Sequence, residues 1–488
     1  MIPEDRQPQL PQGDSSLLSS LSQSLSFHSS PESFLALHGR RSAVKLQKVL
    51  EDDVLAHKQT IIRARILNRN VAIVTSRRLC EDILNAGSDE RNSTVTTADK
   101  GPSIGPDTFA AQPAYHDLMA AFFPAPNILL MDFPDHKIKR ELWNEQLSSF
   151  PATATPMICD IVKDHLTSWQ DNSVIDLYDS MKHLSWRILL GIFLQLQPTE
   201  KNYSEIQSLQ ETLLRGQFSL FPVSISTPFW RSPRAKGIKA RAKLQTLLSS
   251  RILLQDKQCP FLRPGKVDDE EVASHALLFT SSIAVKALAS LLTASLLNLF
   301  IMPCEPSLAS RIRNETSAVG GTLLNSILLE TERLSPPVIG IMRRVQQDII
   351  LASPNGEPPV LIPAGWDIWL YFVAAARDNA EYEGANTFQP ERFMEPDKTS
   401  PGLAFGTGPK TCLGQHISRQ IVNAVTTTIL ETDIHLEGSV DAEGVRGWLG
   451  WDSNVSVEAF ARDLKQLPCQ RPKEPIELQI RRSRSGGE

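Results

Sequence analysis

The sequence predicts a mainly α-helical protein with a smaller β region. Residues 151–255 have a mainly helical pattern, and the apolar stretch His275–Met302 is far longer than a typical strand. Strand-like alternation is confined to short segments, of which Ile61–Ser76 is the clearest. With 488 residues, the chain is long enough for two or three ordinary domains or for one large mixed fold.

Charge and cysteine usage exclude several classes of protein. The net charge of −5 and the isoelectric point near 6.1 give no overall electrostatic case for nucleic-acid binding. The six cysteines are far apart and form no Cys-x-x-Cys pair, which disfavours a zinc cluster and a dense disulfide framework. A reduced, intracellular setting fits this pattern better. The cysteines are Cys80, Cys159, Cys259, Cys304, Cys412 and Cys469.

Both ends of the chain are polar. Residues 1–40 are rich in Ser, Gln and Pro, and we expect them to be flexible, with neither a signal peptide nor a membrane-spanning anchor. A short helical signal follows at Ser42–His57. We expect residues 41–482 to form a single domain and residues 483–488 to be a charged tail. These features predict an intracellular protein that is either cytoplasmic or bound peripherally to a membrane.

The first elements after the polar N-terminal segment are short. Ile61–Ser76 alternates like a β-hairpin with its turn at Asn68–Asn70, and Arg78–Asn85 has a helical pattern. Residues 86–130 contain many Gly, Pro and aromatic residues and little periodicity, so we expect a long loop region. A loop of this length in a compact protein is usually functional.

The segment Asp132–Leu147 predicts a helix that carries several basic groups. His136 and Arg140 are one helical turn apart on the same face, where two neighbouring hydrogen-bonding groups can hold a pair of carboxylates. The alternative is an ordinary solvated basic helix, because Lys137 and Lys139 belong to the same segment.

The helical region 151–255 has two expected breaks, at Phe221–Pro222 and at Pro228–Pro233. A basic run, Arg231–Lys243, follows the second break. We interpret it as a solvated helix face, with light contact to an anionic membrane surface as the alternative.

The stretch His275–Met302 is long enough to span a bilayer. It contains Lys286 and several Ser and Thr residues, and it lies deep inside the chain. We therefore expect one long buried helix, and a transmembrane span is the alternative.

The second half of the chain predicts one more helix and then mainly strands. The helix contains Glu330 and Arg333 at ion-pair spacing among leucines, which favours a buried network with further partners. Residues Ile341–Pro363 predict short strands joined by an Asn-Gly turn, and another strand follows Gly365. Residues Ile434–Ile480 are expected to be mostly strand and loop.

The most distinctive segment is Phe405–Gly414, FGTGPKTCLG, which holds a single cysteine before a predicted helix. The positive end of a helix dipole favours the thiolate form of Cys412. Glycines let the backbone approach a bulky flat partner and leave N–H groups free to face the sulfur. These are the requirements of a metal-bound thiolate with tuned hydrogen bonds. The alternative is a buried free cysteine in a glycine-rich turn.

Written as F-x-x-G-x-x-x-C-x-G, this segment resembles the haem-binding loop of cytochromes P450. Glu330-x-x-Arg333 resembles the ExxR motif of that family, and Pro390–Phe393 resembles its PERF segment. The resemblance spans roughly residues 45–480 and implies the P450 fold, with haem b between a long I helix and the cysteine loop with its L helix. It also implies that Cys412 is the axial ligand of the haem iron and that Arg392 joins Glu330 and Arg333 in a buried network.

The resemblance also implies contacts to the haem. His136 and Arg140 resemble the propionate-binding pair of the C helix, and Arg343 resembles a strand arginine that meets a propionate. Lys410 stands where the family commonly has Arg or His, and it keeps the charge without a bidentate contact. Phe405 and Gly414 complete the cofactor-binding residues that the resemblance implies.

One part of the sequence departs from the family pattern. The I helix of the family usually carries an acid and an alcohol that relay protons to bound oxygen, whereas Ile283 and Ala284 align with those positions. The hydroxyls of Thr280, Ser281 and Ser282 are candidates for a water relay, or they bond back to carbonyls one turn earlier. For Lys286 we expect a solvent-facing position, with a place near the substrate pocket as the alternative.

By this resemblance, the chain is expected to be a monooxygenase that uses O2 and electrons from a separate NADPH-dependent P450 reductase or a ferredoxin-type donor. Lys137, Lys139 and Lys410 are candidates for docking that donor, or they are ordinary solubilising lysines. Two other hypotheses remain open: an isomerase, dehydratase or ring-forming oxidase on the same fold, and a non-catalytic haem-binding protein.

The expected substrate is a small to medium hydrophobic molecule, such as a terpenoid, polyketide or fatty acid of specialised metabolism. Aromatic residues supply apolar surface where the family places the roof of its pocket, although core packing explains each of them equally well. They are Phe109, Tyr115, Phe122, Phe123, Phe218, Phe221, Phe229 and Trp230.

Overall fold

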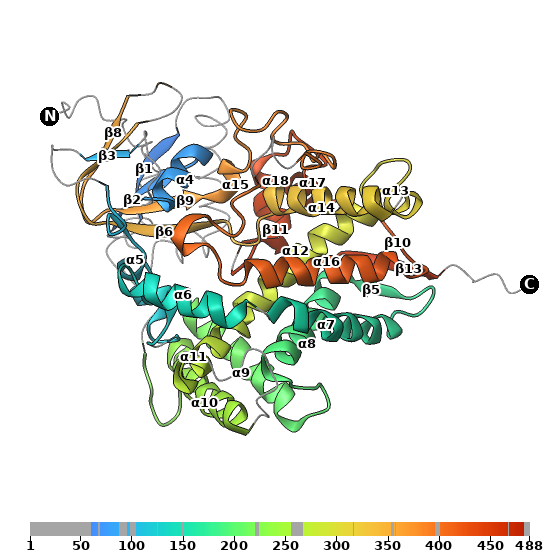
Figure 1. Ribbon diagram of the computed structural model, residues 1–488, viewed down its shortest axis with the longest axis horizontal. Coiled ribbons are helices and arrows are strands. Elements are labelled where there is room, and N and C mark those ends of the chain that lie inside the picture. The colour runs from blue at the N-terminus through green and yellow to red at the C-terminus, as the bar shows by residue number, and fades with distance from the viewer. Residues whose placement is uncertain are drawn as a thin grey trace, which may run out of the picture.

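The computed structural model describes residues 60–482 except 67–68, 87–94, 98–103, 124, 149, 220–223, 255–266, 316, 353–355, 357, 396–400 and 467. The predicted flexible segment 1–40, the helical signal at Ser42–His57 and the tail 483–488 lie outside the described residues. A β-rich region and a larger helical region make up the rest (Figure 1). The prediction of a mainly α-helical fold with a smaller β region is confirmed.

The main sheet has five strands in the order β1-β2-β9-β6-β4. The predicted hairpin is confirmed, since β1 pairs antiparallel with β2 and Ile61 faces Val74. The later strand β9 then adds parallel to β2, and β6 pairs antiparallel with β9. The strands are β1 (Ile61–Ile66), β2 (Arg69–Val74), β9 (Asp367–Tyr371), β6 (Gly340–Val345) and β4 (Phe109–Ala110).

Three smaller sheets complete the β structure. The first joins β3 (Val95–Thr97), β7 (Ile349–Leu351) and β8 (Val360–Ile362). The second joins β10 (Ile434–Glu437), β13 (Glu477–Arg482) and β5 (Val174–Asp176). The third is the two-stranded pair of β11 (Leu464–Lys465) and β12 (Arg471–Pro472).

Helices form most of the remaining structure. Those before the centre of the chain are α4 (Arg77–Leu84), α5 (Gln112–Met119), η3 (Ile128–Leu130), α6 (Asp135–Leu147), α7 (Phe150–Thr167), α8 (Leu177–Leu194), α9 (Lys201–Gln217) and α10 (Pro233–Leu254). Those after it are α11 (Asp269–Phe279), α12 (Ser282–Phe300), α13 (Leu308–Asn314), α14 (Ser317–Leu334), α15 (Phe372–Ala375), η5 (Gly408–Lys410), α16 (Gln415–Leu430), α17 (Glu443–Leu449) and α18 (Val457–Asp463).

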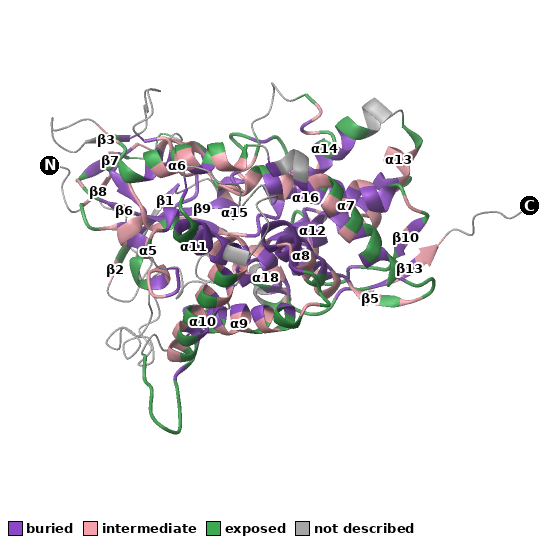
Figure 2. Cartoon of the chain, turned by 60° about the horizontal axis from the view of Figure 1, so that its bottom comes forward, coloured by how far each residue is buried: buried purple, intermediate pink, exposed green. Residues whose placement is uncertain are grey.

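The helix α12 runs through the centre of the helical region and packs against α8, α14 and α16. Its leucines belong to the largest hydrophobic core cluster of the described residues. By length and composition α12 is the one described helix that would be able to cross a membrane, but most of it is buried inside the protein. Figure 2 shows this buried centre between the more exposed outer helices. We therefore assign α12 as a core helix.

The expectation of one helix over His275–Met302 is wrong in one respect, because the helix is divided in two. The helix α11 begins after Asp268, whose side chain caps it, and ends at Phe279. Ser281 then accepts a hydrogen bond from the backbone N–H of Ala284 and caps α12. Three consecutive hydroxyl residues compete with the backbone for hydrogen bonds, which favours a cap over an uninterrupted helix.

Two other regions also contain more regular structure than the sequence predicts. The expected loop 86–130 holds β3, β4, the helix α5 and the turn η3. The helix α5 is short and buries only Ala114 and Leu118, so its periodicity is too brief to detect. In the C-terminal part, α17 and α18 interrupt the expected strands and loops.

Candidate active site

The cysteine loop is a tight turn that joins η5 to α16. The backbone N–H of Cys412 donates to the carbonyl of Phe405 at 2.9 Å, which closes the loop on itself. Gly408 has φ of +72°, and a Cβ at this position would lie 2.4 Å from the carbonyl oxygen of Leu84. Only glycine satisfies both conditions, which explains why this position of the crowded turn is a glycine.

The thiol of Cys412 faces the start of α16. Burial raises its pKa, and the backbone N–H groups of Gly414 and Gln415, together with the charge of Arg140, act in the opposite direction. The residue is nevertheless accessible. A thiol that is surrounded by protein and still accessible borders an internal space, which is the position expected for a ligand of an enclosed group.

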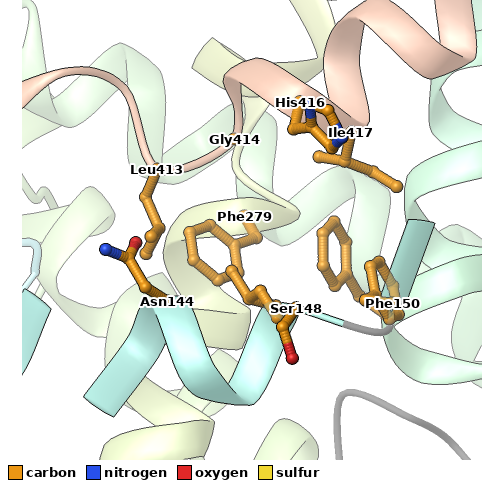
Figure 3. A pocket seen from close by; sticks show the side chains of 10 residues that line it. Asn144, Ser148, Phe150, Phe279, Leu413, Gly414, His416 and Ile417 are labelled. Carbon is orange, nitrogen blue, oxygen red and sulfur yellow. The ribbon is translucent and has the colours of Figure 1, made fainter. Parts of the chain in front are cut away.

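A cavity of about 210 Å³ lies beside this turn. Figure 3 shows the rings of Phe279 and Phe150 on the side of the cavity opposite the turn that carries Leu413, Gly414 and His416. The cavity is lined by Asn144, Leu147, Ser148, Phe150, Phe193, Phe279, Leu413, Gly414, His416 and Ile417. It therefore brings α11 and the cysteine loop together, although they are far apart in the sequence.

One side of α11 and α12 is apolar, and its residue Phe279 lines this cavity. Phe279, Ile283, Ala284 and Ala287 are half-buried, whereas most of their neighbours on α11 and α12 are fully buried. Their spacing places them along one side of the two helices. This face therefore borders an internal space without a hydroxyl or carboxyl group of its own.

A cluster of basic side chains lies beside the cysteine loop. Arg140 of α6 donates a hydrogen bond to the carbonyl of Thr411, the residue before the cysteine. Lys410 forms an ion pair of 2.7 Å with Asp132. Arg343 of β6 is buried and donates to the carbonyl of Met342 at 2.8 Å.

His136 belongs to the same cluster and is neutral at pH 7. Its pKa falls to about 4, first because the ring is buried and then because Lys410, Arg140 and Arg343 repel a further positive charge. Asp132 opposes this effect. The structure thus brings Lys410 together with the three residues that the resemblance singled out for binding propionates, His136, Arg140 and Arg343.

The charges of this cluster fit a haem. Arg140, Arg343 and Lys410 are positively charged, and each lowers the pKa of His136. One carboxylate, that of Asp132, accepts a hydrogen bond from Lys410. The group therefore has a net positive charge, which suits a ligand with two carboxylates. The thiol of Cys412 is close enough to this cluster for the charge of Arg140 to act on it, so the donor set matches iron protoporphyrin with a thiolate ligand.

Glu330, Arg333 and Arg392 form one buried ion network. Arg333 donates to both carboxylate oxygens of Glu330 at 2.7 Å, and Arg392 donates to Glu330 at 3.1 Å. The backbone N–H of Gln389 also donates to Glu330, at 3.0 Å. This network joins α14 to the segment that precedes the cysteine loop, and its carboxylate is fully satisfied.

Arg333 also fixes the backbone on the way to the cysteine. It donates to the carbonyl of Ala385 at 2.7 Å, and its guanidinium lies 4.7 Å from the centre of the Tyr382 ring. A Cβ at Gly402 would lie 2.8 Å from the Cα of Arg333. The chain therefore passes directly over this network just before it enters the loop.

The three helix hydroxyls do not lie on the apolar face. Thr280 donates to the carbonyl of Ala276 at 2.7 Å, as in the alternative interpretation of this residue. Ser281 is the cap of α12, and Ser282 is buried with no hydrogen bond of normal geometry. The hydroxyls of Thr280, Ser281 and Ser282 therefore do not form a continuous hydrogen-bonded path to the cavity.

The expectation that Lys286 faces solvent is wrong. Lys286 is buried and forms an ion pair of 2.9 Å with Glu211 of α9. Burial lowers its pKa and the carboxylate of Glu211 raises it. A lysine is buried at this cost only with a partner, and the sequence did not indicate the partner.

Two of the three lysines proposed for docking a donor have partners within the chain. Lys139 pairs with the buried carboxylate of Glu271, which also accepts a hydrogen bond of 3.0 Å from the indole of Trp143. Lys410 pairs with Asp132, as described above, and Lys137 is exposed. Sequence reasoning missed Glu271, whose only signal was its place beside the apolar stretch.

The aromatic residues expected at a pocket roof separate into two groups. Phe122 and Phe123 are fully buried in the core, whereas Phe229 and Trp230 are 99% and 54% exposed. An exposed side chain cannot cover an internal pocket, so that expectation is wrong for Phe229 and Trp230. Phe109 is buried, Tyr115 accepts a hydrogen bond from the N–H of Met342, Phe218 is half-buried, and Phe221 lies outside the described residues.

Comparison with known proteins gives the same class of protein as the site. The profile of the cytochrome P450 family matches residues 305–432. Cytochrome P450 26B1 from Bos taurus is 25% identical over 341 residues, which cover 61% of this chain and 63% of that protein. Cytochrome P450 85A2 from Arabidopsis thaliana is 24% identical over 330 residues, which cover 60% of this chain and 66% of that protein.

Two solved structures share the fold over most of their length. Retinoic acid-bound cyanobacterial CYP120A1 has a TM-score of 0.67 at 19% identity and covers 90% of this chain and 94% of its own. P450BioI in complex with hexadec-9Z-enoic acid-ligated acyl carrier protein has a TM-score of 0.60 at 18% identity and covers 91% and 99%.

The fold is that of the cytochrome P450 structures, and Cys412 lies within the part of the chain that the family profile matches. The chain is therefore similar in sequence to cytochromes P450 and shares the fold of their solved structures.

Proposed function

We propose that this chain is a haem-thiolate monooxygenase whose axial ligand is Cys412. The observation that carries the proposal is the pairing of this thiol, at an internal space, with the basic cluster on α6 and β6. A thiolate-ligated haem supplies, when bound, the capacity to activate O2 and oxidise C–H bonds. The residues of the chain hold the cofactor and shape the space above it.

Each proposed contact follows from the charge of the group. Arg140, Arg343 and Lys410 bind the propionates, and His136, as a neutral ring, donates or accepts a hydrogen bond there. The N–H groups of Gly414 and Gln415 stabilise the thiolate. Phe405 closes the loop through its carbonyl, and its ring lies 5.5 Å from the guanidinium of Arg419.

The network of Glu330, Arg333 and Arg392 is proposed to hold the segment that leads into the cysteine loop. Its carboxylate and guanidinium groups are buried and joined by charge-assisted hydrogen bonds, which resist displacement more than neutral ones. In this role the three residues do not touch the cofactor, and they keep the loop in a fixed position.

The proposed substrate is hydrophobic, because Phe150, Phe193 and Phe279 line the cavity and Ile283 and Ala284 continue the same apolar side of the helices. Terpenoids, polyketides and fatty acids share this property. One of the two similar structures has retinoic acid bound, and the other has hexadec-9Z-enoic acid ligated to an acyl carrier protein, which makes these two acids practical first probes.

Electrons are proposed to come from a separate protein, either an NADPH-dependent P450 reductase or a ferredoxin-type donor. Lys137 remains a candidate for contact with this donor, since it is exposed on α6. An intracellular location is proposed, with peripheral contact to a membrane through exposed residues near the start of α10. These are Ile225, Phe229, Trp230 and Arg231.

The apolar helix face also supports a second candidate function. Ile283 and Ala284 occupy the positions where the family usually has its acid and alcohol, and Thr280 is bonded to its own helix. An isomerase, a dehydratase or a ring-forming oxidase on this fold would not need that proton relay.

The first experiment is the absorption spectrum of the reduced, carbon monoxide-bound protein beside that of Cys412→Ala. The proposal expects a red-shifted Soret band of the thiolate type, which the variant lacks. The second experiment measures NADPH consumption with a generic reductase and either acid probe. A thiolate spectrum without NADPH consumption or oxygenated product would favour the second candidate function, and no thiolate spectrum would contradict both.

A further inference from the structure

The helix α14 carries a second buried carboxylate beside the ion network of Glu330. Glu332 is two residues further along, so its side chain leaves a different face of the helix. This side chain is 5% exposed and pairs with Arg419 of α16. The Nε atom of Arg419 donates to the two carboxylate oxygens at 2.9 Å and 3.1 Å, and its Nη2 atom donates at 2.6 Å. The pair therefore joins α14 to the helix that follows the cysteine.

Arg419 also contacts the beginning of the cysteine loop. Its guanidinium lies 5.5 Å from the centre of the Phe405 ring. The carbonyl of Phe405 accepts the hydrogen bond of 2.9 Å from the backbone N–H of Cys412. An ion pair, a ring contact and a backbone hydrogen bond thus connect Glu332 to the residue that carries the thiol.

The two carboxylates of α14 hold the chain on opposite sides of the loop. Glu330, with Arg333 and Arg392, fixes the segment that leads into the loop. Glu332 fixes the helix that leads out of it. Because both attachments belong to one helix and consist of charge-assisted hydrogen bonds, a displacement of either side of the loop has to break strong contacts.

The charges of Glu332 and Arg419 are balanced only while both partners are present. Burial raises the pKa of Glu332, whereas the hydrogen bond and the charge of Arg419 act in the opposite direction. The guanidinium therefore helps to keep the carboxylate ionised. Without the carboxylate, a positive charge would remain uncompensated next to the loop. Net charge is one of the properties that set the reduction potential of a metal centre.

We propose that Glu332 is a positioning residue for the cysteine ligand and acts through Arg419 and Phe405. By holding the guanidinium against the ring, it keeps the loop in place. By cancelling the positive charge, it keeps the reduction potential of the bound haem low. The inference rests on the proposed haem-thiolate function and adds to it a second attachment of α14, separate from the network of Glu330.

The first test measures the reduction potential of the haem-loaded protein by spectroscopic titration with dithionite. Glu332→Gln should shift the equilibrium about tenfold toward the reduced form, which is about +59 mV for a one-electron couple. The reason is that an uncompensated cation stabilises the added electron. Glu332→Gln/Arg419→Gln removes both charges, so its equilibrium should return to within about twofold of the wild-type value. This return separates an effect of charge from damage to the loop.

The matched control is Glu431→Gln, which removes an exposed carboxylate at the other end of α16. An α-helix rises about 1.5 Å per residue, so this position is about 18 Å further along the helix than Arg419. That distance is larger than the Debye length at ordinary ionic strength. The control should therefore keep the wild-type potential.

Arg419→Lys separates the position of the loop from its charge. Lysine keeps the positive charge, but it lacks the planar fork that binds both carboxylate oxygens of Glu332 and stacks on the Phe405 ring. Hydrogen exchange followed by mass spectrometry should show about tenfold faster exchange in residues 405–412 of this variant. Its reduction equilibrium should stay within about twofold of the wild-type value, because the charge is retained. This readout is independent of whether Glu332→Gln folds.

The reduced, carbon monoxide-bound spectrum of the wild-type protein distinguishes the two levels of inference. A thiolate-type Soret band, combined with an unchanged potential in Glu332→Gln or unchanged loop exchange in Arg419→Lys, would overturn the role of Glu332 and leave the haem-thiolate function intact. A wild-type protein without that band would overturn the proposed function and this inference together.

Discussion

Arg140 of α6 donates a hydrogen bond to the backbone carbonyl of Thr411, the residue before Cys412. A single side chain therefore links the helix that carries the basic cluster to the loop that carries the thiol. The same guanidinium acts on the thiol electrostatically and opposes the rise in its pKa that burial causes. The position of the loop and the charge around it thus depend on one residue.

The first prediction concerns that residue. Replacing Arg140 by Met should increase the rate of haem transfer to apomyoglobin at least tenfold, since a hydrogen bond to a charged group is worth about 1.5–3 kcal/mol. Lys137→Met removes an exposed cation from the same helix and should leave the rate within about twofold. Equal rates for the two variants would show that Arg140 does not hold the cofactor.

The second prediction concerns the buried ion network. Glu330→Gln should lower the free energy of unfolding by about 3–5 kcal/mol or prevent folding, because it leaves Arg333 buried with an uncompensated charge. Glu391→Gln is the matched control, as Glu391 pairs with Arg311 at the surface and should contribute less than about 1 kcal/mol. Urea unfolding and haem content after purification measure both effects, and equal losses would contradict the proposed role.

The third prediction concerns stability at acid pH. Burial is the first cause that lowers the pKa of His165 from 6.5 to about 4. Its depressed pKa means that the unfolded chain binds more protons between these values, so stability is fully present above pH 6.5 and falls toward pH 4. His136 and His275 have the same shift and add to this fall.

His165→Gln should therefore reduce the loss of stability between pH 7 and pH 5, measured by urea unfolding at each pH. Within the described part of the chain, the His165 ring forms one hydrogen bond, with the Ser180 hydroxyl at 3.0 Å. Glutamine is able to form a similar bond and is therefore a tolerable replacement. His116→Gln, at an exposed position on α5, is the control substitution. An identical loss in His165→Gln and in the wild-type protein would contradict the shift.

The features that the sequence predicted well are encoded by residues close together along the chain. The cysteine loop is ten consecutive residues, and Glu330 and Arg333 are one turn apart on α14. Their geometry depends mainly on local backbone structure, so spacing alone was informative. The break of the long apolar helix was not predicted, although the hydroxyl run at Thr280–Ser282 was a local signal that favours a cap.

The features that were missed depend on contacts between distant parts of the chain. Lys286 and Glu211 are separated by 75 residues, and Lys139 and Glu271 by 132. Each lysine alone looks like a solvated charge, and only the packing of two helices shows that it is paired. The exposure of Phe229 is similar, because an aromatic residue in a loop does not indicate which way the loop faces.

The last prediction concerns the backbone of the cysteine loop. Gly406 and Gly408 both have positive φ, at +69° and +72°, so alanine at either position adds strain of about 1–2 kcal/mol. They differ in available space, since a Cβ at Gly406 meets nothing within 4 Å, whereas one at Gly408 lies 2.4 Å from the carbonyl oxygen of Leu84. Gly408→Ala should therefore destabilise the protein more than Gly406→Ala, and it should reduce haem content further, because α4 would have to move away from the loop. Urea unfolding of the two variants isolates the steric effect, and equal destabilisation would mean that the loop and α4 are less closely packed than the structure indicates.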